Sequence, residues 1–193
     1  VDTQKRYTYD IDKVIFAIGH SSRDTYKMLH SRGVAMENKP FAIGVRIEHL
    51  RKDIDKMQYG EAVSNPLLEA ATYNMAFNNK KETRGTFSFC MCPGGEIVNA
   101  SSELGASLVN GMSYSTRSGK FSNSAIVVGI SEKDYGNQIF SGMYLQEKLE
   151  KKNYEIVGTY GAIYQNIIDF MKHKKTTFEI ESSYKMKLFS YDI

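Results

Sequence analysis

The stretch from residue 84 to residue 101 reads RGTFSFCMCPGGEIVNAS and holds both cysteines of the chain. Its first half alternates with the period of a β-strand. The face that carries Phe87 and Phe89 is expected to turn toward the core, which leaves Cys90 and Cys92 on the opposite face among small polar residues. The sequence therefore predicts an extended strand with both thiols on its polar side.

A turn is expected directly after this strand. Pro93 removes a ladder donor, and Gly94 and Gly95 let the backbone approach another group closely, which suits a ligand site as well as a simple turn. Residues 96–100 are expected to pair back across the turn as the second strand of a hairpin.

The two cysteines are expected to remain free thiols. On an extended strand their Cα atoms would lie about 6.5 to 7 Å apart, at the limit of what a disulfide can bridge. Three interpretations stay open: small buried cysteines beside a turn, reactive thiols, or a zinc site, although the sequence offers no second pair of ligands for zinc. Because disulfides are rare in reducing compartments, two free cysteines indicate a cytoplasmic protein.

Composition excludes several classes of partner. The chain has 193 residues, a length sufficient for one substantial domain. Its formal net charge of +3 is too small to indicate a nucleic-acid partner. No apolar run reaches the length that a bilayer requires, so no membrane partner is expected.

The N-terminal part contains the pattern of a strand, a turn and a helix. Residues 14–18 form a continuous apolar run typical of a strand buried on both faces. Gly19 follows at once, and Ser21 with Asp24 has the spacing of a capping box, so a helix is expected to run from there to a stop at Gly33. In open α/β sheets such a turn lies where ligands bind.

The remaining pattern predicts an α+β fold with a mixed, largely antiparallel sheet and flanking helices. Residues 41–48 alternate well, and their polar face carries Arg46 beside a glycine, where a ligand could enter or where the charge could simply be solvated. Residues 124–130 are apolar without alternation, as in a central strand. Residues 138–151 and 162–173 have the spacing of amphipathic helices.

Four motifs together resemble a family of bacterial FAD-dependent oxidoreductases, the uncharacterised proteins usually described as FAD-dependent dehydrogenases. The motifs are residues 14–24, 39–49, 90–95 with 99–101, and 110–114. The resemblance implies that residues 1–36 are the remnant of a Rossmann-like FAD-binding domain. Residues 37–193 would then be the inserted or C-terminal, cap-like domain on the substrate side.

The chain departs from the full family pattern because it has no G-x-G-x-x-G after a strand to hold the pyrophosphate. FAD is therefore expected in the intact parent protein and not on this fragment alone. By position, the resemblance implies flavin-facing, catalytic and substrate-side residues. The flavin-facing residues are Gly19, His20, Ser21 and Arg23; the catalytic candidates are Cys90, Cys92 and His20; the substrate-side candidates are Arg46, Gly94 and Gly95.

The expected function of the parent protein is hydride transfer between FAD and a small substrate, with His20 or a cysteine moving the proton. The alternative is a non-catalytic domain that binds a partner or forms a homodimer. In either case the expected partner is the rest of the FAD-binding domain.

Overall fold

The computed structural model describes residues 7–78 and 84–193. The chain divides into two compact units, Val1–Met36 and Glu37–Ile193, here called the N-terminal unit and the main unit. Each is described by itself. The assignment of the first as a remnant of an FAD-binding domain stays a prediction.

The N-terminal unit contains the helix that the sequence predicts, α1 (Arg23–Ser31). It is followed by Gly33, whose φ of 84° is the left-handed conformation that ends many helices. The expected capping box is wrong, because the N-cap is Ser22 and makes no side-chain capping bond. The Ser22 hydroxyl instead donates to the Ile18 carbonyl at 2.7 Å.

The strand expected at residues 14–18 is not formed. This run has no regular secondary structure and pairs with no strand in the described part of the chain. Its side chains are open to solvent, with Val14 57%, Ile15 92% and Phe16 57% exposed. A strand of this composition is stable only between neighbours that complete its ladder and cover its faces.

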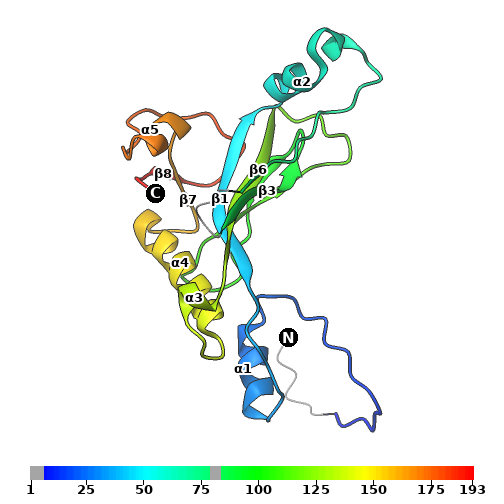
Figure 1. Ribbon diagram of the computed structural model, residues 1–193, viewed down its shortest axis with the longest axis vertical. Helices are drawn as coiled ribbons and strands as arrows, with labels where there is room; N and C mark the ends of the chain where they lie inside the picture. Colours follow the sequence, from blue (N-terminus) through cyan, green and yellow to red (C-terminus); the bar gives the residue numbers. More distant parts are fainter. Residues whose placement is uncertain (1–6, 79–83) are drawn as a thin grey trace. The chain divides into compact units, whose positions relative to one another are not determined.

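The main unit is built on a four-stranded antiparallel sheet, so the predicted α+β fold with a largely antiparallel sheet is confirmed. Figure 1 shows its three long strands side by side. The strand order is β1-β6-β3-β2. The strands are β1 (Phe41–Leu50), β2 (Ala76–Asn78), β3 (Gly85–Cys92) and β6 (Phe121–Ile130).

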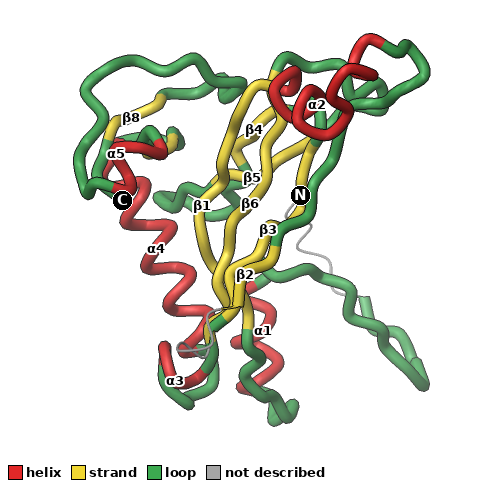
Figure 2. The backbone as a smooth tube through the Cα atoms, turned by 45° about the horizontal axis from the view of Figure 1, so that its top comes forward, coloured by secondary structure: helices red, strands yellow, loops and turns green. Residues whose placement is uncertain are grey.

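Two small sheets flank the large one. β4 (Glu96–Asn99) pairs antiparallel with β5 (Val109–Met112), and β7 (Ala162–Tyr164) pairs parallel with β8 (Leu188–Ser190). Figure 2 shows β4 and β5 beside β1 and β6, and β5 contacts both β1 and β3. The expected hairpin between β3 and β4 is therefore wrong, because the chain leaves the large sheet after β3 and pairs in a second layer.

The helices are mostly short. They are α2 (Arg51–Tyr59), the 3₁₀ turn η1 (Gly60–Ser64), α3 (Glu132–Tyr135), α4 (Ser141–Val157) and α5 (Ile167–Met171). α4 corresponds to the helix predicted at residues 138–151. The helix predicted at 162–173 is reduced to α5, because residues 162–164 pair with β8 instead. Within the described ranges, no helix combines the length and the apolar character that crossing a membrane requires.

The predicted strand at residues 124–130 is confirmed as β6, which lies between β1 and β3. It begins earlier than the apolar run, however, and its first half is polar. Ser122, Asn123 and Ser124 are each 0% exposed. The centre of the sheet is therefore polar where β6 begins, and polar groups buried there need hydrogen-bond partners.

Candidate functional site

The cysteine strand β3 is interrupted by a β-bulge. Its register against β6 shifts between Phe89 and Cys92, and Cys90 within the bulge has a φ of 49°. The residues before the bulge keep their alternation, but their burial is the reverse of the prediction: Phe89 is 62% exposed, whereas Ser88 is 8% exposed. The expected aromatic core face is wrong, and the two cysteines do not share a face, since Cys90 is exposed and Cys92 is buried.

Arg46 on β1 lies at the centre of a set of polar groups beside this bulge. Its Nη1 donates to Asn123 Oδ1 at 2.6 Å and to the Cys90 carbonyl at 3.3 Å, and its Nη2 donates to Asn110 Oδ1 at 3.0 Å. Asn123 belongs to β6 and Asn110 to β5. We call Arg46, Cys90, Cys92, Asn110 and Asn123 the Arg46 cluster.

The register of the sheet explains why these residues meet. Arg46 lies opposite Ala125 on β6, so that Asn123 is its diagonal neighbour on the same face. Cys92 on β3 lies opposite Asn123 from the other side. β5 then covers this face at Gly111, where a Cβ would lie 2.2 Å from Asn123 Oδ1 and 2.3 Å from Arg46 Nη1. A larger residue at position 111 would therefore displace the Arg46 and Asn123 side chains from this arrangement.

The two thiols of the cluster differ in environment, and both are free. Burial raises the pKa of the Cys92 thiol, although the nearby Arg46 guanidinium acts in the opposite direction. Cys92 Sγ donates to the Cys90 carbonyl at 3.4 Å. A buried thiol with a raised pKa is a weak nucleophile. The exposed Cys90 is therefore the thiol that a ligand or reagent can reach.

We expect Cys90 to react with iodoacetamide at pH 7.5 at least about tenfold faster than Cys92, because the reaction requires an accessible thiolate. Timed quenching followed by peptide mass spectrometry measures both rates in one sample. In Cys90→Ser the fast phase should vanish and the slow one should persist. Equal labelling of the two cysteines in the native protein would contradict the assignment.

The glycines after the bulge are held against this chain's own backbone. Gly94 and Gly95 are buried, and Gly94 has a φ of 53°. A Cβ at Gly94 would lie 1.8 Å from the Arg117 carbonyl oxygen, and one at Gly95 would lie 2.3 Å from the Met112 carbonyl oxygen. This packing accounts for both glycines without a ligand. Their assignment to the substrate side stays a prediction.

The opposite face of β1 carries a second polar contact. His49 Nε2 and the Tyr73 hydroxyl are 2.8 Å apart. Burial lowers the pKa of His49 and raises the pKa of Tyr73. Both shifts favour the neutral forms, so this pair is a hydrogen-bonded contact of the interior rather than a charged site. It does not belong to the Arg46 cluster.

Residues 40–193 match the model of a family described as FAD-dependent protein, C-terminal domain-like. The chain belongs to this family. It is also 45% identical over 168 residues to an uncharacterised protein of Clostridium beijerinckii, an alignment that covers 86% of this chain and 32% of that protein. The chain thus spans about a third of the length of that relative.

Membership in the FAD-dependent C-terminal domain family confirms, at that level, the flavoprotein that the sequence motifs indicated. The dehydrogenase reaction stays a prediction. The matched range starts at residue 40, so it contains the whole Arg46 cluster.

The predicted flavin-facing residues all lie in the N-terminal unit. Gly19 has a φ of 72°, and a Cβ there would meet no atom within 4 Å, so the turn is open to approach. The Gly19 carbonyl accepts from the Tyr26 hydroxyl at 2.7 Å, and His20 Nε2 lies 3.1 Å from the Ser21 hydroxyl. Arg23 is 3% exposed. These residues form a turn before a helix, as the prediction requires.

The turn at Gly19 does not form a whole pyrophosphate cradle, and its contact with FAD stays a prediction. The turn at Gly19 leads into α1 with one glycine, whereas a pyrophosphate cradle uses three at fixed spacing. Gly94 and Gly95 lead into β4 and not into a helix. The glycines that would hold the pyrophosphate are therefore not found in the described ranges.

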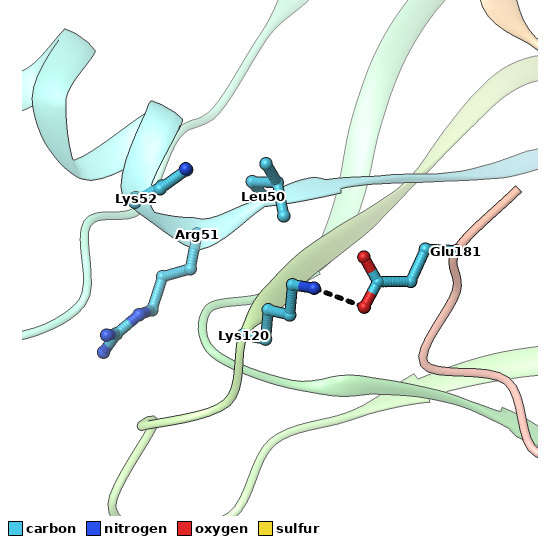
Figure 3. Close-up of a pocket in the computed structure, with 5 residues that line it drawn as sticks. All are labelled: Leu50, Arg51, Lys52, Lys120 and Glu181. Carbon is cyan, nitrogen blue, oxygen red and sulfur yellow. Dashed lines mark hydrogen bonds and ion pairs between the residues drawn. The ribbon is translucent and has the colours of Figure 1, made fainter.

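A shallow pocket of about 370 Å³ lies elsewhere in the main unit, lined by Leu50, Arg51, Lys52, Lys120 and Glu181 (Figure 3). Its charges are largely satisfied from within. Lys120 pairs with Glu181, as the dashed line in Figure 3 marks, and Arg51 pairs with Asp55 at 3.7 Å. No feature of the sequence predicts this pocket.

Asn123 is not predicted from the sequence as a site residue, and Asn110 enters the prediction only as the first residue of the motif at 110–114. A Ser-Asn-Ser triplet before an apolar strand was the available signal for Asn123, because polar residues that enter a central strand need partners. Their contact with Arg46 depends on strand register and could not be read from the sequence. Among the residues that the structure describes, no three His, Cys, Asp or Glu side chains gather as metal ligands.

Proposed function

We propose that this chain forms the substrate-side wall of an FAD-dependent oxidoreductase that transfers a hydride between FAD and a small substrate. The observation that carries the proposal is the Arg46 cluster, in which a half-buried cation donates a hydrogen bond to the backbone carbonyl of Cys90 at a β-bulge, and the Cys90 side chain is exposed. Bulges often redirect a side chain beside an active site. When bound, FAD supplies the hydride chemistry, and the residues of this chain orient the substrate and move a proton.

In this proposal Cys90 exchanges the proton that accompanies the hydride. In the direction of substrate reduction, the Cys90 thiol gives its proton to the substrate and regains one from solvent, which its exposure permits. Cys92 is less suited to this task because it is buried and its pKa is raised. His20 in the N-terminal unit is the other candidate for the proton transfer.

The flavin edge is assigned to Gly19, His20, Ser21 and Arg23. The open turn at Gly19 supports this assignment. The exposed apolar run at residues 14–18 supports a further step, in which it completes a sheet with the rest of the FAD-binding domain. The free thiols support a reducing compartment, and we place the protein in the cytoplasm.

The test uses the flavin-loaded protein that contains this chain. The flavin is reduced chemically under anaerobic conditions, and its reoxidation by a panel of small carbonyl and imine compounds is followed at the flavin absorption band. We expect at least one compound to reoxidise the flavin. Cys90→Ser should slow that reaction by about tenfold to a hundredfold, which is within the usual contribution of a positioned proton donor.

The amount of bound flavin, measured by absorbance, is the control for each variant. His20→Gln is compared in parallel, because it removes the other candidate for proton transfer. Reoxidation at the native rate in both variants would refute the proton-transfer roles. A panel in which no compound reoxidises the flavin would argue against hydride transfer itself.

A further inference from the structure

Arg46 carries a half-buried positive charge that no carboxylate in the described ranges neutralises. Its hydrogen bonds go to Asn123, Asn110 and the Cys90 carbonyl, all of which are neutral groups. Other cations of the main unit have carboxylate partners: Arg51 with Asp55, Arg84 with Asp134, Arg117 with Glu69 and Lys120 with Glu181. A charge withdrawn from water is costly unless it is paired.

The side-chain amide of Asn123 also lacks a hydrogen-bond acceptor among the described residues. Its Oδ1 must face Arg46, because a guanidinium can only donate hydrogen bonds. Its Nδ2 is then fixed as a donor, and it is buried with no acceptor among the described residues. Asn123 is 0% exposed, so this donor is not hydrated from the surface, and a ligand reaches it only when the covering chain moves aside. Buried donors of this kind are rare and call for an acceptor.

The Arg46 guanidinium has more N–H donors than its three hydrogen bonds to oxygen use. It has five N–H groups, of which the bonds from Nη1 and Nη2 to three oxygens use three, and the Cys92 thiol is a further, weak and neutral partner. The Asn110 and Asn123 oxygens hold the planar fork in place. A guanidinium fixed in this way is preorganised for a planar acceptor with two oxygens.

We propose that the Arg46 cluster binds a carboxylate group of a small-molecule ligand. This inference rests on the proposed function in one respect: it takes the carboxylate-bearing ligand to be the substrate of the proposed reaction. One guanidinium among neutral amides balances a single negative charge, which fits a carboxylate better than a phosphate dianion. Because the Cys90 carbonyl lies 3.3 Å from Arg46 Nη1, a carboxylate held here would bring the rest of the ligand close to Cys90.

The test measures binding directly by titration calorimetry of the flavin-loaded protein at low ionic strength. The probes are acetate and succinate, with acetamide as the neutral analogue of the same shape. We expect acetate and succinate to bind and acetamide to bind at least about tenfold more weakly, because charge-assisted bonds are roughly twice as strong as neutral ones. Equal binding of acetate and acetamide, or no binding of the carboxylates, would overturn the proposal.

Substitutions then locate the site. Arg46→Met should weaken acetate binding at least about tenfold, whereas Arg51→Met, which removes a cation from the pocket of Figure 3, should leave it unchanged. The reverse pattern would place the site in that pocket and overturn the assignment to Arg46.

Asn110→Asp tests the same idea without removing the cation. Asn110 is exposed and already accepts from Arg46 Nη2, so an aspartate there supplies an internal carboxylate that competes with the ligand. We expect it to weaken acetate binding about tenfold and to leave the melting temperature unchanged or raised. If Arg46→Met fails to fold, this variant decides, and unaltered binding in it would overturn the proposal.

Calorimetry also separates this inference from the proposed function. Binding of carboxylates needs no turnover. A protein that binds acetate but whose flavin is not reoxidised would support the carboxylate site and contradict the proposed hydride transfer. Flavin reoxidation in a protein that does not bind carboxylates would support the proposed hydride transfer and contradict the carboxylate site.

Discussion

Replacing Gly94 by alanine should lower the free energy of unfolding of the main unit by about 2 to 6 kcal/mol. A left-handed backbone costs a residue with a Cβ about 1 to 3 kcal/mol, and Gly94 has a φ of 53°. The new Cβ would also lie 1.8 Å from the Arg117 carbonyl oxygen, and overpacking of a tight site typically costs another 1 to 3 kcal/mol or so. Urea unfolding monitored by circular dichroism measures the loss.

Gly129→Ala is the matched control, because it is also a glycine of this sheet region but has open space around its Cβ position. It should change the free energy of unfolding by less than about 1 kcal/mol. The turn after the bulge is also pinned by two hydrogen bonds, from Gly119 N to the Gly94 carbonyl and from Gly94 N to Ser122 Oγ, both 3.0 Å. Equal stability of the two variants would show that this turn can relax around a methyl group.

Replacing Asn123 by alanine should lower the free energy of unfolding by about 2 to 4 kcal/mol. The change removes a hydrogen bond to a charged group, worth about 1.5 to 3 kcal/mol, and leaves a small void in a closely packed region; loss of the unpaired Nδ2 donor offsets part of this cost. Asn123 is 0% exposed, so water cannot readily replace the lost acceptor of Arg46. Chemical unfolding at pH 7 measures the effect.

Asn110→Ala provides the comparison, because Asn110 accepts from the same guanidinium but is exposed. Water can replace its oxygen, and the expected cost is below about 1 kcal/mol. A similar loss in both variants would mean that burial does not set the value of these bonds. A negligible loss in Asn123→Ala would show that Arg46 is readily solvated without its partner.

The elements that the sequence predicts well are those whose signal is local. β1 follows from the alternation at residues 41–48, and β6 from the apolar run at residues 124–130. α1 follows from the segment between Gly19 and Gly33. In each case the residues themselves, rather than their neighbours in space, decide the conformation.

The errors arise where tertiary contacts override the local pattern. The alternation in β3 predicts an aromatic core face, but the tertiary contacts bury Ser88 and leave Phe89 exposed. The turn at Pro93–Gly95 is a plausible hairpin by composition, yet its backbone packs against the loop at residues 113–119, and β4 pairs with β5. The apolar run at residues 14–18 has the composition of a strand without the neighbours that a strand needs.

The candidate site was predictable only in part. Arg46 and Cys90 could be predicted as candidates from the sequence. Arg46 is a cation beside a glycine on a polar strand face, and Cys90 carries a thiol next to a Pro-Gly-Gly turn. Asn110 and Asn123 reach Arg46 from strands that are distant in sequence, and their contact depends on a register that a shift of one residue would reverse. Sequence patterns name the strands of a sheet more readily than they name its cross-strand pairs.

The backbone at Cys90 sets stability and chemistry against each other. A φ of 49° suits glycine, and an exposed cysteine gains little packing energy in return for the strain. Selection for thermal tolerance alone would therefore tend to replace this residue by glycine. Selection for a reactive sulfur would keep the cysteine. Laboratory evolution for heat resistance would show whether Cys90 is replaced by glycine or retained.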